Sequence, residues 1–262
     1  MQDKLESFSR LIDIMDTLRE QCPWDKKQTL ESLRYLTIEE MYELSDAILE
    51  RDMQEIKKEL GDLLLHIVFY ARIASETDDF DISDVINSLC DKLIHRHPHI
   101  YGDVEVKDEK EVKKNWEKLK LKEGKRSVLE GVPNSLPAVI KSFRIQEKVR
   151  GIGFDWDNKS QVWDKVMEEI TELQAEVKKG DRKRIESEFG DVLFALTNYA
   201  RFIDVNPEDA LERTNKRFIK RFQIMENIIE EEGVSLNDMS LDQMDVYWDR
   251  AKAIYVSKQN IG

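Results

Sequence analysis

The chain has 262 residues, of which 36% are charged, with only 10 glycines and 5 prolines, a composition typical of helical globular proteins. Its formal net charge of −13 opposes general binding to nucleic-acid polymers or anionic membranes. The two cysteines form no CxxC motif, and the charged N-terminal segment lacks a secretory hydrophobic region. The longest apolar stretch, residues 63–71, is far shorter than the roughly 20 residues that cross a membrane. We therefore expect an all-α, cytoplasmic protein without a membrane span.

Five acidic residues in the first half of the chain recur in the second half. They are Glu39, Glu40, Glu43, Glu59 and Asp62, and one constant offset relates them in turn to Glu168, Glu169, Glu172, Glu188 and Asp191. Short motifs that flank these acids also recur in the same order. For example, "KLIHR" (92–96) in the first half corresponds to "RFIKR" (217–221) in the second. Because self-similarity of this kind marks a duplicated structural unit, we expect two similar domains in tandem.

Apolar residues recur with a helical period from residue 60 to residue 71, beside Glu59 and Asp62. Leu60, Leu63, Leu64, Ile67 and Ala71 occupy positions i, i+3, i+4, i+7 and i+11, which predicts an amphipathic helix with this face buried. The short segments 50–52 and 178–181 predict that the helices on either side of them run antiparallel. Each half is therefore expected to be a four-helix-bundle-like domain.

Two glycines and two prolines interrupt the helical pattern between residues 122 and 137. Glycine and proline are the strongest local breakers of helices, so this segment is the expected boundary between the copies. We predict an N-terminal domain at 1–121, a linker at 122–136 and a C-terminal domain at 137–262.

The acidic residues are predicted to converge. In helical projection Glu39, Glu40 and Glu43 share one arc of about 100°, and Glu59 and Asp62 lie about 60° apart on the next helix. Like charges one turn apart destabilise a helix by a few tenths of a kcal/mol per pair. Their repetition beside an apolar stripe therefore favours a bound cation over a merely solvated acidic face.

The type of ligand narrows the choice of metal. Carboxylate oxygens without cysteine or paired histidine suit Mg²⁺ or Mn²⁺ better than zinc or copper. A di-iron site in a helical bundle would need Glu-x-x-His on two helices. None of the four histidines follows a glutamate by three positions.

Several short motifs of the sequence closely resemble those of one known family. "EEMYE…ELGD", "EEITE…EFGD", "CPWDKKQT", "RHPHIYGD" and "GFDWD" are similar to the MazG-like family of bacterial nucleoside triphosphate pyrophosphohydrolases, which are all-α NTP pyrophosphatases. The resemblance spans essentially the whole chain. It implies a homodimer and Mg²⁺-dependent hydrolysis of NTPs and dNTPs to monophosphates and pyrophosphate. Broad specificity, a role in clearing the nucleotide pool, and Mn²⁺ as a substitute cofactor are part of this expectation.

The same resemblance implies roles for residues of the second half. Glu169, Glu172, Glu188 and Asp191 would bind the metal, and Glu168 would either hold a second metal or orient the attacking water. Arg217 and Arg221 would bind phosphate, and Trp248 and Lys252 would also bind the substrate. Comparison of the two halves adds Asn198 and Asn215 to these candidates. Asn198 lies seven residues after Asp191 and within about 20° of it in helical projection, so its amide could contact a base or ribose edge. Core packing is an alternative for Trp248, and a buried structural amide is an alternative for Asn215.

The first half has a corresponding site with differences. Beyond its five acids, it comprises Lys92, Arg96, Trp116 and Lys120. Phe69 stands where the second half has Asn198, and Cys90 stands where it has Asn215. We therefore expect the second half to be the main catalytic site and the first to be weaker or structural. The alternative is a non-enzymatic scaffold or nucleotide sensor, but the basic residues that follow each acidic group favour the enzyme.

Overall fold

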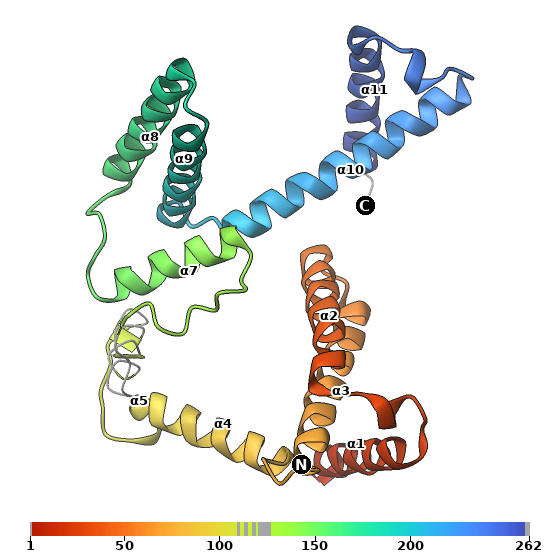
Figure 1. Ribbon diagram of the computed structural model, residues 1–262, viewed down its shortest axis with the longest axis vertical. Helices are drawn as coiled ribbons and strands as arrows, with labels where there is room; N and C mark the ends of the chain where they lie inside the picture. The colour runs from red at the N-terminus through yellow and green to blue at the C-terminus, as the bar shows by residue number, and fades with distance from the viewer. Residues whose placement is uncertain (1, 109–110, 113–114, 117–118, 120–126, 260–262) are drawn as a thin grey trace. The chain divides into compact units, whose positions relative to one another are not determined.

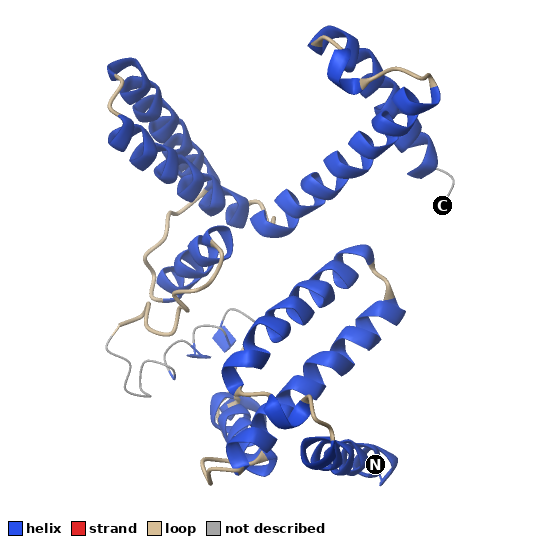
Figure 2. Cartoon of the chain, turned by 45° about the vertical axis from the view of Figure 1, so that its right-hand side comes forward, coloured by secondary structure: helices blue, strands red, loops and turns tan. Residues whose placement is uncertain are grey.

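The computed structural model describes residues 2–108, 111–112, 115–116, 119 and 127–259, and helices make up almost all of their regular structure. Figure 2 shows no strand in this part of the chain, so the all-α prediction is confirmed. None of the helices within the described residues is long and apolar enough to span a membrane. The chain divides into two units, Met1–Leu119 and Lys120–Gly262.

The first unit is built around a pair of long antiparallel helices (Figure 1). Its elements are α1 (Gln2–Gln21), η1 (Asp25–Lys27), α2 (Leu30–Glu50), α3 (Met53–Ser75), α4 (Ile82–Arg96) and α5 (Pro98–Tyr101). Helix α3 packs along α2 and also contacts α1. Met15, Leu33, Val68 and Phe69 from these three helices form the buried core.

The second unit contains two helical hairpins and a further helix, α7. Its elements are α7 (Ala138–Gly151), α8 (Lys159–Lys179), α9 (Arg182–Phe202), α10 (Pro207–Glu231), η2 (Leu236–Asp238) and α11 (Leu241–Gln259). Helices α8 and α9 form one hairpin, and α10 and α11 form the other (Figure 1). Met225, Ile228, Ile229 and Ala251 are buried between α10 and α11.

The turns of the two acid-bearing hairpins have the same construction. Helix α2 ends before Arg51, which has a left-handed backbone with φ 58°, and Asp52 then caps α3 by accepting hydrogen bonds from two backbone N–H groups. In the second unit Gly180 has φ 79°, and Asp181 caps α9 in the same way. One residue in the left-handed region followed by an aspartate cap therefore reverses the chain in both copies.

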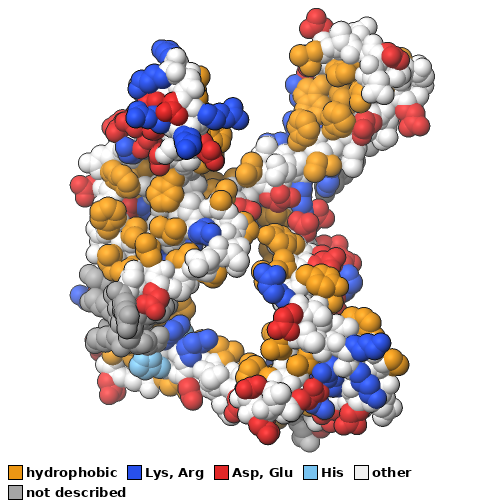
Figure 3. All heavy atoms as spheres, viewed as in Figure 1, with side chains coloured by type: hydrophobic (Ala, Val, Ile, Leu, Met, Phe, Trp, Pro, Cys, Tyr) orange, Lys and Arg blue, Asp and Glu red, His pale blue; other side chains and the backbone are white. Residues whose placement is uncertain are grey.

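The apolar stripe predicted on α3 is only partly buried. Ala71 is 1% exposed, but Leu60 and Ile67 are 53% and 48% exposed. The side chains that α3 buries among α1 and α2 are Val68 and Phe69, so the predicted burial of the whole stripe is wrong within this unit. Hydrophobic side chains also gather on the visible surface of α10 and α11 (Figure 3).

Gly180 should be more sensitive to substitution than its open surroundings suggest. A Cβ at this position would meet no atom within 4 Å, so the cost of Gly180→Ala comes from the left-handed backbone alone, about 1–2 kcal/mol. For a chain of this size we expect the melting temperature to fall by about 2–4 °C per kcal/mol, measured by circular dichroism. Gly180→Asn is the matched control and should lose less, because asparagine tolerates this conformation. Equal melting temperatures for both variants would contradict the strain argument.

Candidate functional site

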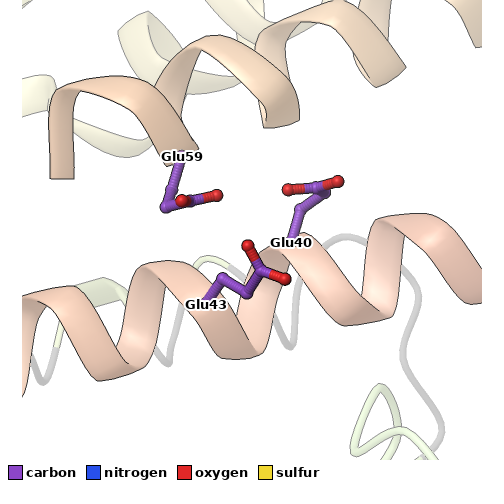
Figure 4. A group of neighbouring side chains, drawn as sticks. All are labelled: Glu40, Glu43 and Glu59. Atoms are coloured by element: carbon purple, nitrogen blue, oxygen red, sulfur yellow. The ribbon is translucent and has the colours of Figure 1, made fainter. Parts of the chain in front are cut away.

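Three acidic side chains of the first unit converge between α2 and α3. Glu40 and Glu43 on α2 and Glu59 on α3 each place a carboxylate oxygen within 4.8 Å of the others. Figure 4 shows all three pointing into the space between the two helices. Glu59 is only 2% exposed, and its Oε2 atom is buried without a hydrogen-bond partner. An acceptor oxygen buried in this way among other acids fits a bound cation.

The electrostatics of this first cluster support the same conclusion. Burial, followed by the negative charges of Asp62 and Glu43, raises the pKa of Glu40. Lys58 donates to Glu59 Oε1 at 2.9 Å, and this hydrogen bond lowers the pKa of Glu59. The charged form of Glu40 is thus disfavoured by its surroundings, and a cation among these oxygens would relieve that cost.

The second unit repeats the arrangement between α8 and α9. Glu169 and Glu172 on α8 and Glu188 on α9 place carboxylate oxygens within 4.8 Å of one another. Burial, followed by the charges of Glu172 and Asp191, raises the pKa of Glu188. The structure therefore brings together, in each copy, three acids at equivalent positions, and Asp62 and Asp191 are close enough to act on them.

A lysine lies at the edge of each cluster, but from a different position. In the second copy Lys165 on α8 contacts Glu169 at 2.7 Å and Glu168 at 2.9 Å. In the first copy the lysine is Lys58 on α3, and Leu36 occupies the position that corresponds to Lys165. The neighbouring carboxylates raise the pKa of both lysines. Both clusters therefore already attract a cationic group, which is what a metal site built from carboxylates would do.

Sequence reasoning missed one acid of the second hairpin. Glu176 on α8 is 8% exposed, and its charge is among those that raise the pKa of Glu188. The equivalent position of the first copy is Ala47, so a comparison limited to acids common to both copies passes over it. Glu176 lies one helical turn after Glu172, and this spacing alone would have predicted that it lies on the same face of α8 as the cluster.

The predicted phosphate-binding residues lie on the other hairpin of the second unit. The Arg221 guanidinium lies 5.1 Å from the Tyr255 ring, and Arg217 donates to Thr214. The Trp248 ring packs 5.0 Å from Phe218, and Lys252 pairs with Asp249. These contacts are all made within α10 and α11, whereas the acids lie on α8 and α9. The alternative of core packing for Trp248 is consistent with its place beside the α10–α11 core.

The two candidate asparagines have different surroundings. Asn198 is 4% exposed, and its Oδ1 accepts hydrogen bonds from Arg201 Nε at 3.2 Å and Nη2 at 2.7 Å. Arg201 in turn makes a bidentate ion pair with Asp155. These contacts favour a positioning role for Asn198 over the predicted contact with a base or sugar. Asn215 is exposed and donates to Glu212, so the alternative of a buried amide is wrong.

The remaining first-copy candidates are spread over several elements. Glu39 is exposed on α2, as Lys92 is on α4, and Arg96 is half-buried at the end of α4. The Trp116 ring lies 5.3 Å from the His97 ring in an edge-to-face arrangement. Lys120 lies outside the described residues.

Comparison with known proteins identifies the family. The model of the MazG nucleotide pyrophosphohydrolase domain matches residues 28–101 and 158–225, and both acidic clusters fall inside these matches. A nucleoside triphosphate pyrophosphohydrolase/pyrophosphatase MazG of Thermotoga maritima is 44% identical, over 94% of this chain and 95% of its own length. A nucleoside triphosphate pyrophosphohydrolase of Escherichia coli K12 is 38% identical, over 95% and 98%.

A solved structure, that of a MazG-related protein from Thermotoga maritima, is 26% identical over 43% of this chain and 98% of its own, with a TM-score of 0.39. A likeness of that extent adds nothing to the assignment. The two domain matches and the nearly full-length relatives suffice for it. The chain belongs to the MazG family, carries its domain twice, and is an enzyme of that family, a nucleotide pyrophosphohydrolase.

Proposed function

We propose that this protein hydrolyses nucleoside triphosphates, both NTPs and dNTPs, to monophosphates and pyrophosphate, with Mg²⁺ bound by the second acidic cluster. The observation that carries the proposal is the convergence of Glu169, Glu172 and Glu188 in a domain of the MazG family. Relatives from Thermotoga maritima and Escherichia coli that align over nearly their whole length are named as nucleoside triphosphate pyrophosphohydrolases. Broad specificity and a role in clearing the cytoplasmic nucleotide pool belong to the same proposal.

The donor set suits a hard divalent cation. Glu169, Glu172, Glu188 and Asp191 would hold Mg²⁺, or Mn²⁺ in its place, since both prefer oxygen ligands. When bound, the cation supplies charge neutralisation for the triphosphate and a more acidic water. Glu168 is exposed beside Lys165. Its ion pair with Lys165 holds it at the edge of the cluster, and both expected roles, holding a second metal or orienting the attacking water, remain part of the proposal.

Basic side chains of α10 and α11 would receive the phosphates. Arg217 and Arg221 lie one turn apart on α10, and charge-assisted hydrogen bonds from arginine suit phosphate oxygens. Such donors stabilise negative charge as it develops on the departing pyrophosphate. A scaffold or sensor that only binds metal would have no need for these residues, and this favours the enzyme over the non-catalytic alternative.

We further propose that a second copy of the chain completes the site. Large apolar side chains are exposed on both hairpins of the second unit, including Phe189 and Leu193 on α9 and Phe218 and Ile219 on α10. Soluble monomers rarely expose extensive apolar surface of this kind. A homodimer would cover these residues and would allow acids and basic side chains to meet from different hairpins.

The products of the reaction test the proposed activity. Incubation with the common NTPs and dNTPs and Mg²⁺ should release pyrophosphate and monophosphate, detected as phosphate after addition of inorganic pyrophosphatase. The same assay without inorganic pyrophosphatase is the control and should show no phosphate. Direct release of orthophosphate with a diphosphate would instead mean attack at the γ-phosphorus.

The two clusters should differ in their contribution to turnover. Glu172→Ala is expected to reduce pyrophosphate release by roughly 100-fold or more, because it removes a ligand from the principal electrostatic stabiliser. Its counterpart Glu43→Ala is the matched control and should keep a substantial fraction of activity. Circular dichroism should show both variants folded. The reverse ranking, or equal losses, would make the first copy a full catalytic domain.

Light scattering tests the proposed dimer. The mass in solution should be about twice the 30.9 kDa of one chain, because the exposed apolar residues need a covering surface. The measurement should be repeated over a wide range of protein concentration. A mass that stays at that of one chain throughout would rule the dimer out.

A further inference from the structure

Arg221 on α10 lies against an aromatic ring instead of an acid. Its guanidinium carbon is 5.1 Å from the centroid of the Tyr255 ring on α11. Its Nε atom is buried and has no hydrogen-bond partner. Among the described residues, the ion pairs of the second unit include none with Arg221. A cation over an aromatic face is attracted by the ring quadrupole, so the ring favours one position of this guanidinium.

A ring and a carboxylate hold an arginine with different consequences. Arg201, also in the second unit, makes a bidentate ion pair with Asp155, which neutralises its charge and occupies its N–H donors. The face of a tyrosine ring attracts a guanidinium without accepting its in-plane N–H groups. Arg221 is therefore oriented in a way that keeps its charge and its donors for an anion.

The two arginines of the basic pair differ in this respect. Arg217, one turn before Arg221, is exposed and donates to Thr214 Oγ1 at 3.1 Å on its own helix. Arg221 is half-buried and contacts a ring of the neighbouring helix. A side chain that is already ordered loses less conformational freedom when its ligand binds. Arg221 is therefore the better prepared of the two to receive a phosphate.

We propose that Tyr255 is a positioning residue whose ring presents the Arg221 guanidinium to the triphosphate. The proposal rests on the proposed function, in which Arg221 binds phosphate, and it deepens that function by naming the residue that orients this contact. Donors fixed in advance stabilise negative charge on the departing pyrophosphate without reorganising during the reaction. Tyr255 thus acts on the reaction only through Arg221.

The sequence of the first copy differs at the corresponding position. In the register that aligns Trp116 with Trp248, Glu123 corresponds to Tyr255, and Arg96 corresponds to Arg221. Glu123 lies outside the described residues. A glutamate cannot hold an arginine by a ring face, and a carboxylate competes with phosphate for a guanidinium. The proposed positioning contact therefore belongs to the second copy.

The competing explanation is that Tyr255 serves only to pack α11 against α10. The same hairpin provides a matched contact, because the Arg250 guanidinium also lies 5.1 Å from a tyrosine ring, that of Tyr247. Arg250 and Tyr247 both donate to Glu232, so this arginine is already paired with an acid. Removing the two rings separately distinguishes a positioning role from a packing role.

Steady-state pyrophosphate release by the full chain, with Mg²⁺ and an NTP that the wild type hydrolyses, makes this comparison. Tyr255→Leu should lower kcat/KM by roughly 3- to 10-fold, the range expected for a lost cation–π contact. Tyr255→Phe keeps the ring and should recover most of that loss. Tyr247→Leu is the matched control and should keep the wild-type kcat/KM, although its melting temperature should fall because it also loses the hydrogen bond to Glu232.

A double-mutant cycle tests whether Tyr255 acts through Arg221. The dissociation constant of a nonhydrolysable α,β-methylene triphosphate analogue is measured by calorimetry for wild type, Tyr255→Leu, Arg221→Met and the double variant. Tyr255→Leu should weaken binding in the wild type and add nothing in the Arg221→Met background, because no guanidinium remains to be oriented.

Four results would overturn the positioning role and leave the proposed function intact. They are no loss of kcat/KM in Tyr255→Leu, an equal loss in Tyr255→Phe, an equal loss in Tyr247→Leu, and a weakening of analogue binding by Tyr255→Leu that persists in Arg221→Met. A wild type that releases no pyrophosphate would overturn the proposed function, and the positioning role with it.

Discussion

The site depends on two antiparallel helices that hold carboxylates opposite one another. In both copies a two-residue reversal, Arg51–Asp52 or Gly180–Asp181, sets the register of the hairpin. That register places an acid from the second helix, Glu59 or Glu188, against two acids from the first. Repulsion among these carboxylates favours cations in the seam between the two helices. Each lysine or metal ion that enters this seam removes an unfavourable interaction.

Much of this site could be predicted from the sequence, because a helix converts spacing directly into position. The constant offset between Glu40 and Glu169 sufficed to predict both clusters, and short turns sufficed to pair the helices. Spacing could not show which residues distant in the sequence a side chain would contact. Asn198 projects beside Asp191, yet its oxygen is held by Arg201, whose ion pair with Asp155 joins segments 46 positions apart.

The two copies show how one framework acquires different contacts. Arg72 and Arg201 are equivalent residues on α3 and α9, but Arg72 pairs with Asp16 of α1, whereas Arg201 pairs with Asp155. The lysines that contact the clusters also come from different helices. The acids themselves stay in one register. Contacts around the seam therefore vary, while the group of oxygens that would bind the cation is retained.

The hairpin tolerates the repulsion between its carboxylates because apolar packing at the end opposite its turn outweighs that repulsion. Leu33 and Val162 are equivalent residues and both are fully buried, seven positions before Glu40 and Glu169. Burying one such side chain contributes about 1.5–3 kcal/mol, whereas a like-charge pair one turn apart costs only a few tenths of a kcal/mol. Because this packing lies two helical turns from the acids, it fixes the separation of the helices where the carboxylates meet. The carboxylates can therefore stay close together between the two helices without the helices moving apart.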